Sequence, residues 1–307
     1  MFNCLIVLLL LCWFNVAHAD IKLVVPFGAG GLTDNVARQL ESGLSRELNK
    51  PIILDYRLGA AGLIGVKSLA QTKTSDVVIM FIDAMALSNI ILLNDGVGLD
   101  DVNYISQVGY TTSIALAVKK NSALKNIDAW RTSKTPVNVG INGLGGAHHY
   151  YSYLFATQTR APITDIPFKG TGEMISMLMG GHIDAIWSSA SSLEQYEQAG
   201  KIEIVAVNSP RRIETFPNTP TFKEIGVDMT QGAKWVIISN NTADAATVRQ
   251  IEQAVNRLLI NPTFVQNLKE LGITVELKLS NQSRSTMLTT LQQQAKFAEY
   301  VRSRNAK

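Results

Sequence analysis

Short apolar runs separated by amphipathic stretches dominate the pattern of this 307-residue chain. Runs rich in Val, Ile and Leu predict β-strands, and runs without polar residues are typical of parallel strands covered on both faces. The predicted strands are residues 21–26, 51–56, 77–82, 113–118, 137–141, 165–167, 185–187, 204–208 and 235–239.

Helical periodicity fills several of the intervals between these strands. Residues 33–48 and 246–259 carry apolar side chains at every third or fourth position. Asn261 followed by Pro262 predicts the start of a further helix, which ends near Gly272. A long helix is predicted at about 283–302. Strands that alternate with helices indicate an α/β fold.

The length favours two lobes over one. Candidate hinges are residues 119–122, after a predicted strand, and 232–235, before another. The chain then leaves the first lobe once and returns once, so that residues 20–119 plus 236–307 form lobe 1 and 120–235 form lobe 2. We expect two mixed, mostly parallel sheets flanked by helices, a ligand cleft between the lobes, and a C-terminal helix packed on lobe 1.

We expect residues 1–19 to be a signal peptide that is cut before Asp20. Its apolar core is too short to span a bilayer, and it ends in Ala17-His18-Ala19, a small-x-small cleavage pattern. The expected location is therefore the periplasm. A lipid anchor at Cys12 is the alternative, although Leu11 stands before it where small residues are favoured.

Both cysteines, Cys4 and Cys12, lie in this segment. The mature part therefore offers no thiol catalysis, no disulfide and no cysteine-based metal site. The formal net charge of +3 comes without a cluster of Lys and Arg, so no nucleic-acid partner is expected.

A glycine-rich loop follows the first predicted strand. Gly28 and Gly30 match two positions of the dinucleotide fingerprint, but Thr33 stands where the third glycine is needed. A P-loop needs Gly-Lys-Ser/Thr, which is missing here, and the carboxylate of Asp34 would repel a phosphate. The loop disfavours a nucleotide, and we expect no cofactor.

Two further loops of this kind, at 59–65 and 143–149, also follow apolar runs. In open α/β sheets the crevice lies beyond the carboxyl ends of the strands, where glycines let backbone N–H groups approach a ligand. Helix N-termini there favour an anion. Three such loops favour contact with a carboxylate. The alternative is that each glycine only permits a tight turn.

No catalytic or metal site is expected. His148 and His149 are adjacent, so they point about 100° apart on a helix, and no carboxylate or further His pairs with them locally. The serine run at 188–192 lacks a Gly-x-Ser-x-Gly elbow. An envelope hydrolase or isomerase is an alternative function, but it lacks an evident catalytic set.

Six motifs are spread in order over the mature chain. They are VVPFGAGGLTDNVAR (24–38), DYRLGAAGLIG (55–65), GLGGAHHY (143–150), IPFKGTGEMISMLMGGHIDAIW (166–187), AGKIEIVAVNSPRRIETFPNTPTFKEIG (199–226) and the Asn261-Pro262 helix start. In these motifs the chain resembles the Bug family, the extracytoplasmic substrate-binding receptors of tripartite tricarboxylate transporters. Each motif is weak alone, but the set is specific.

The resemblance implies a two-lobed receptor of the type II periplasmic-binding-protein kind that closes on a dicarboxylate, tricarboxylate, aromatic acid or amino acid. It implies ligand contacts from lobe 1 at Ala29, Gly30, Gly31, Thr33 and Asp34. It implies contacts from lobe 2 at Gly143, Gly145, Gly146, His148, Lys169, Gly170 and Asp184. It also implies a monomer with transporter membrane subunits as transient partners.

The chain departs from the family pattern at several positions. Leu58 and Leu63 replace a proline and an asparagine that family members often carry. Small and hydroxyl residues usually follow the third strand, whereas this chain has Asp83 and Ala84, which we include among the candidate contacts. An acid is a poor neighbour for a second carboxylate, so one hypothesis is that Asp83 favours a ligand with a cationic or hydroxyl group. The alternative is that Asp83 caps a helix at the cleft rim.

The expected mechanism is hinge closure around the ligand, with no bond broken. Asp34 would either cap its helix or hold a bound water. A sensory receptor that passes its ligand-bound form to a signalling partner would have the same fold, so the sequence leaves that alternative open.

Overall fold

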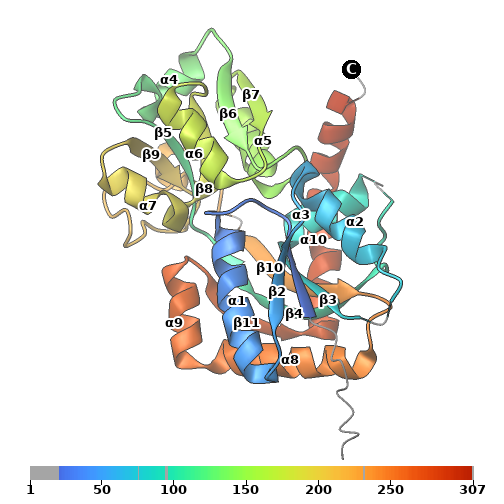
Figure 1. Ribbon diagram of the computed structural model, residues 1–307. Helices are drawn as coiled ribbons and strands as arrows, with labels where there is room; N and C mark the ends of the chain where they lie inside the picture. Colours follow the sequence, from blue (N-terminus) through green and yellow to red (C-terminus); the bar gives the residue numbers. More distant parts are fainter. Residues whose placement is uncertain (1–20, 75, 94–95, 231, 306–307) are drawn as a thin grey trace, which may run out of the picture.

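The computed structural model describes residues 21–74, 76–93, 96–230 and 232–305, so the predicted signal peptide and Cys12 lie outside the described residues. Two mixed β-sheets, each flanked by helices, form two lobes (Figure 1). The predicted two-lobed α/β fold is confirmed.

Lobe 1 is built on a six-stranded sheet in the order β11-β4-β10-β3-β1-β2. Its strands are β1 (Ile21–Val25), β2 (Ile52–Tyr56), β3 (Val78–Asp83), β4 (Val102–Thr111), β10 (Ala233–Asn240) and β11 (Thr274–Leu279). One face is covered by α1 (Leu32–Leu48), α8 (Ala245–Ile260) and α9 (Pro262–Glu270). The other face is covered by α2 (Leu63–Ala70), α3 (Ala84–Leu92) and part of α10 (Ser280–Asn305).

The burial of β1 shows how the sheet is enclosed. Leu23 and Val25 pack with α1 on one face, whereas Val24 packs with α2 and α3 on the other. Successive side chains of a strand point to opposite faces, so a strand covered on both sides is apolar at every position. The continuous apolar runs of the sequence therefore mark the centre of the sheet.

Lobe 2 is built on a five-stranded sheet in the order β7-β6-β8-β5-β9. Its strands are β5 (Ile114–Lys119), β6 (Val137–Ile141), β7 (Ile163–Pro167), β8 (Ala185–Ser189) and β9 (Ile202–Val207). Helices α4 (Ile127–Thr132) and α5 (Ala147–Thr159) cover one face. Helices α6 (Thr171–Gly180) and α7 (Ala190–Gln198) cover the other. Short 3₁₀ turns occur at η2 (Ala60–Gly62), η3 (Ala123–Lys125) and η4 (Lys223–Ile225).

The prediction that the sheets are mostly parallel is wrong. Among the described residues, five of the nine strand pairings are antiparallel, those of β10 with β3 and β4, β11 with β4, and β5 with β8 and β9. An apolar run shows that a strand is buried but not which way it runs. Strands β4 and β11 were not predicted, because polar side chains such as Ser106 and Gln107 interrupt β4.

The chain changes sheet earlier than the predicted boundaries. It leaves the first sheet after Thr111, enters the second at Ile114 and returns at Ala233. The boundaries predicted at 119–120 and 235–236 put β5 in lobe 1 and the start of β10 in lobe 2. In the structure β5 belongs to the sheet of lobe 2, and all of β10 belongs to the sheet of lobe 1. The apolar pattern of β5 fits either sheet equally well, because both sheets are covered on both faces.

Helix α10 packs on both lobes, whereas the sequence predicted packing on lobe 1. Met287 lies in a core cluster of lobe 1, whereas Phe297 and Val301 lie in the cluster of lobe 2. The Phe297 ring is 5.1 Å from that of His149 and 5.3 Å from that of Tyr150, both on α5. In Figure 1 this helix runs from the lobe 1 sheet up beside lobe 2. No helix within the described ranges is both long and apolar enough to cross a membrane.

The two-lobe packing of α10 predicts a large loss of stability in Phe297→Ala. The side chain is 1% exposed, so its removal leaves a cavity between the lobes, which typically costs about 3–5 kcal/mol. Urea unfolding followed by circular dichroism would measure it. The matched control is Leu288→Ala on the same helix, whose side chain is 42% exposed. Equal, small losses in both variants would contradict the packing described here.

Candidate ligand-binding site between the lobes

The two lobes meet through their backbones at the predicted glycine loops. The N–H of Gly28 donates a hydrogen bond to the carbonyl of Lys169 at 2.9 Å. A Cβ on Gly170 would lie 2.8 Å from the Cα of Gly28, and one on Gly143 would lie 2.6 Å from the amide nitrogen of Ala61. These distances leave no room for a side chain. Part of what the glycines do is therefore to let the lobes approach each other.

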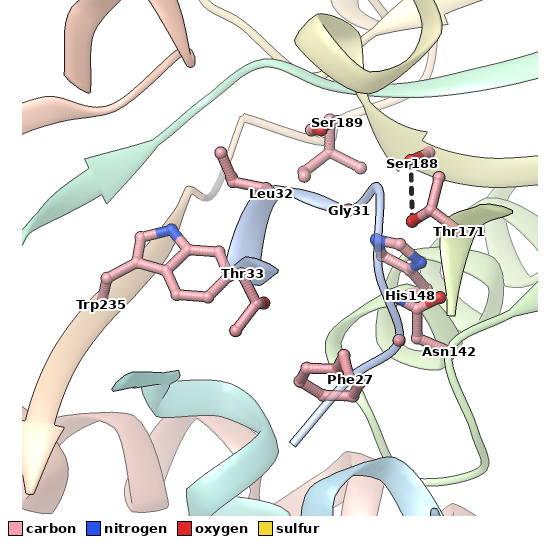
Figure 2. A pocket seen from close by; sticks show the side chains of 12 residues that line it. Phe27, Gly31, Leu32, Thr33, Asn142, His148, Thr171, Ser188, Ser189 and Trp235 are labelled. Carbon is pink, nitrogen blue, oxygen red and sulfur yellow. Dashed lines mark hydrogen bonds between the residues drawn. The ribbon is translucent and has the colours of Figure 1, made fainter. Parts of the chain in front are cut away.

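A pocket lies between the lobes beside these contacts (Figure 2). It consists of two adjoining cavities of about 30 Å³ each. Lobe 1 contributes Phe27, Gly28, Gly31, Leu32, Thr33, Asp83, Ala233 and Trp235. Lobe 2 contributes Ile114, Asn142, Ala147, His148, Thr171, Ser188 and Ser189. Residues of both lobes therefore line the pocket, as is needed in a receptor that closes by a hinge around its ligand.

Several helices begin at this pocket, and three of them lack a side-chain cap. Helices α1, α5 and α6 have glycine at the N-cap, at Gly31, Gly146 and Gly170, with no side-chain hydrogen bond to the first turn. Helix α7, in contrast, is capped by the hydroxyl of Ser189. The first N–H groups of a helix have no partner within it and carry partial positive charge. The three uncapped ends therefore form a place for an anion.

No Lys or Arg side chain lines either cavity in the described part of the chain. The polar side chains in the first cavity are chiefly hydroxyls, and Figure 2 shows the Ser188 Oγ hydrogen-bonded to Thr171 Oγ1 at 3.3 Å. An anion in this pocket would be held by backbone N–H groups and hydroxyls. A carboxylate suits such a site because its two oxygens accept several hydrogen bonds at once.

Three polar side-chain atoms at the pocket are buried and have no hydrogen-bond partner among the described residues. They are Oδ1 of Asn142, Nδ1 of His148 and Nε1 of Trp235. The Trp235 ring is stacked on Phe81 at 4.9 Å, so the indole is fixed in place. A buried polar atom without a partner costs about 1–3 kcal/mol. A polar ligand that meets these atoms would recover that cost.

His148 is neutral in this setting. Its side chain is 7% exposed, and burial lowers its pKa to about 4. At neutral pH it offers one N–H donor and one acceptor rather than a positive charge.

Asp83 caps a helix, as the alternative predicted, and it also lines the pocket, so its effect on ligand preference stays a prediction. Its Oδ1 accepts a hydrogen bond from the N–H of Ala86 at 2.9 Å, which caps α3. The side chain is 3% exposed and lines the second cavity. Burial raises its pKa to about 6, against hydrogen bonds from Ala86 and Met85 that lower it. Nearby ionisable groups are Tyr151, whose pKa Asp83 helps to raise, and His148 in the same cavity.

Asp34 supports the first loop from behind rather than lining the pocket. Its carboxylate accepts hydrogen bonds from the N–H of Gly30 at 3.0 Å and from the hydroxyl of Tyr56 at 2.5 Å, and it pairs with Arg38 at 3.2 Å. Ala29 and Gly30 are exposed and line neither cavity. Of the predicted contacts on this loop, Gly31 and Thr33 lie at the pocket, whereas Ala29, Gly30 and Asp34 lie outside it.

Other predicted contacts also lie outside the pocket. Gly143 and Gly145 are buried beside the pocket. The N–H of Gly145 donates a hydrogen bond to Nδ1 of His149, and its carbonyl accepts one from the side-chain amide of Asn89 on α3. Lys169 contributes its backbone, and its side chain is exposed. Ala84 is buried in the core of lobe 1.

Asp184 is exposed before β8 and accepts a hydrogen bond from the N–H of Asn138. The pocket lies at the other end of that strand, at Ser188 and Ser189. Four residues of strand separate Asp184 from Ser188, about 13 Å.

Sequence reasoning missed Phe27, Asn142, Thr171, Ser188, Ser189 and Trp235. A usable signal existed for Asn142 and Ser189, because each stands at the carboxyl end of a strand that is followed by a helix. Trp235 lies on β10, which pairs antiparallel with β3, and no sequence signal pointed to it. The described residues contain no cluster of three or more His, Cys, Asp or Glu that could hold a metal ion.

The burial of Asp83 predicts that Asp83→Asn stabilises the protein at neutral pH. The folded pKa of about 6 exceeds the ordinary 3.8, so the folded state favours the protonated carboxyl. That stabilisation is complete below about pH 4 and is lost as the pH rises through 6. Asn caps helices about as well as Asp, so the variant should gain up to about 3 kcal/mol at pH 7.5 and nothing at pH 3.5.

Thermal unfolding from pH 3.5 to 8 would measure this difference. Asp184→Asn, an exposed carboxylate, should show no comparable dependence. A variant less stable than the wild type at pH 7.5 would mean that the Asp83 carboxylate has a favourable partner.

Comparisons with known proteins agree with this geometry. The model of the family described as "Tripartite tricarboxylate transporter family receptor" matches residues 36–304. The chain is 26% identical over 296 residues to Protein BugT of Bordetella pertussis, which covers 94% of this chain and 90% of BugT.

Solved structures show the same fold. The structure of the periplasmic binding protein BugD superposes with a TM-score of 0.82 at 22% identity, covering 92% of this chain and 97% of that one. MatC from Rhodopseudomonas palustris, solved with bound malate, superposes with a TM-score of 0.79 at 21% identity, covering 92% and 98%. The family consists of receptors, which agrees with the prediction of a binding protein rather than an enzyme. This chain belongs to the family of tripartite tricarboxylate transporter receptors.

Proposed function

We propose that this protein captures a small carboxylate-bearing solute in the periplasm by closing its two lobes, and then delivers it to the membrane subunits of a tripartite tricarboxylate-type transporter. The observation that carries the proposal is the set of glycine-capped helix ends of α1, α5 and α6 at a pocket that no Lys or Arg of the described residues lines. The malate in MatC is a ligand of the same chemical class.

The size of the pocket favours a small ligand. Each of the two cavities, at about 30 Å³, has room for one or two groups of the size of a water molecule, because about 10–15 Å³ of such space is enough for one water. The direct contact of Gly28 with Lys169 marks a closed arrangement of the lobes. Entry therefore requires the lobes to separate, and binding then favours the closed state.

The ligand class can be tested with the mature protein in a thermal-shift screen of dicarboxylates, tricarboxylates, aromatic acids and amino acids. A ligand at 100 times its Kd that binds only the folded state adds about 2.7 kcal/mol of stability. His148→Ala should weaken the best acid at least tenfold, because it removes a buried polar group of the pocket. Asp184→Asn should leave that affinity unchanged. The proposal fails if no acid shifts the transition; loss of uptake in a deletion strain would test delivery.

Lobe closure predicts a specific effect of Gly170→Ala. Gly170 has an extended backbone with φ of −177°, so alanine introduces no backbone strain there. Its Cβ would, however, stand 2.8 Å from the Cα of Gly28 across the cleft. The variant should fold but close incompletely and bind the acid at least tenfold more weakly.

Titration calorimetry and the ligand-induced decrease in radius of gyration by small-angle X-ray scattering would measure both effects. Gly172→Ala is the matched control on the same helix, because its Cβ would meet only the Ala29 carbonyl at 3.3 Å. Its affinity should change less than threefold. Equal effects in both variants would contradict closure through the Gly28–Gly170 contact.

A further inference from the structure

The two cavities share six lining residues, Phe27, Thr33, Ile114, Asn142, His148 and Trp235, but differ at their far ends. The first alone is lined by Gly31, Thr171, Ser188 and Ser189. The second alone is lined by Asp83, Ala147 and Ala233. The two adjoining cavities thus share most of one wall and have chemically different far ends.

The end at Gly31 and Thr171 suits an anion. The uncapped first turns of α1 and α6 begin there, and the serine and threonine hydroxyls supply further donors. No carboxylate side chain lines this end in the described part of the chain.

The end at Asp83 suits a cation that donates hydrogen bonds. The Asp83 carboxylate is buried, and no Lys or Arg among the described residues pairs with it or lines its cavity. Asn142 Oδ1 is a second acceptor without a partner at the same place. Phe27 and Trp235 add two aromatic rings, whose faces attract an ammonium group. The N–H groups of α3 cannot serve an anion here, because Asp83 itself caps that helix. The uncapped first turn of α5 also begins at this end, at Ala147, so its partial positive charge lies at the same cavity as the Asp83 carboxylate.

We propose that the ligand is a small zwitterion, an amino acid or betaine, whose carboxylate lies at the Gly31–Thr171 end and whose ammonium group lies between Asp83, Asn142 and the Trp235 ring. This inference rests on the proposed function and specifies its ligand. Asp83 is then the residue that selects an ammonium group over a hydroxyl or a second carboxylate. Its buried charge is compensated by the ligand and by no Lys or Arg side chain of the described residues.

The test uses pairs of acids that differ only in the group beside the carboxylate: L-alanine and L-lactate, L-serine and glycerate, L-aspartate and L-malate, and L-glutamate and 2-hydroxyglutarate. Glycine betaine, compared with glycine, reports whether the site prefers a quaternary ammonium. Titration calorimetry on the mature chain at pH 7.5 should give at least a tenfold preference for the amino member of the best-bound pair. Asp83→Asn should reduce that preference at least tenfold by weakening the amino member alone.

Because asparagine also caps helices, Asp83→Asn keeps α3 intact, and its unfolding transition checks this directly. Asp184→Asn removes an exposed carboxylate away from the pocket and should keep the wild-type preference. Tighter binding of the hydroxy acids or dicarboxylates, or an unchanged preference in Asp83→Asn, would overturn the zwitterion and leave the receptor function standing. Binding of none of these acids would overturn this inference, and it would overturn the receptor function as well only if the tricarboxylates and aromatic acids of the thermal-shift screen also fail to bind.

Discussion

The closed arrangement depends on the direct approach of two backbones across the cleft. Gly28 donates to the Lys169 carbonyl, and the Gly28 and Gly170 backbones lie too close for a side chain on Gly170. A second close approach, of Gly143 to Ala61, lies between the other two glycine loops. Because these contacts involve backbone only, they bring the first turns of α1, α5 and α6 to one small space. The binding site is a consequence of how closely the lobes can meet.

The pocket offers no Lys or Arg among the described residues, and this would shape its selectivity. A carboxylate held by an arginine gains from a full charge, whereas here it would meet partial charges of helix ends and neutral hydroxyls. An acid side chain in the same pocket would normally weaken an anionic ligand. Asp83 avoids part of that cost because it faces the end of the pocket away from Gly31. The two ends can therefore serve opposite charges.

The sequence predicted what depends on local pattern and missed what depends on pairing between distant segments. The continuous apolar runs predicted most strands, and Asn261 with Pro262 marked the start of α9 as expected. The glycine loops correctly pointed to the interface between the lobes. Asp34, in contrast, accepts a hydrogen bond from Tyr56 of β2. Tyr56 is 22 residues away in the sequence, so a local motif gives no sign of this contact.

The side chains that line the pocket follow the same rule. Trp235 reaches the pocket only because β10 pairs antiparallel with β3 and sets it opposite Asp83. Asp184 resembles a family contact in sequence, but it precedes β8 and lies at the wrong end of the strand. For strands that are followed by a helix, a residue's distance from the carboxyl end was therefore a better guide to the pocket than its chemical type, whereas Trp235 stands near the amino end of an antiparallel strand.

Helix α10 constrains how the lobes can separate. Its Met287 is fixed in lobe 1, while its Phe297 packs against His149 and Tyr150 of α5 in lobe 2. If the lobes separated at these ring contacts, the buried Phe297 side chain would be exposed to water, which costs free energy. Separation of the lobes is therefore cheapest when the contacts are kept and the lobes rotate about a point near α10. The first turn of α5 also carries His148 into the pocket, on a different side of the helix from His149. A ligand that contacts His148 would therefore touch the same helix against which Phe297 packs.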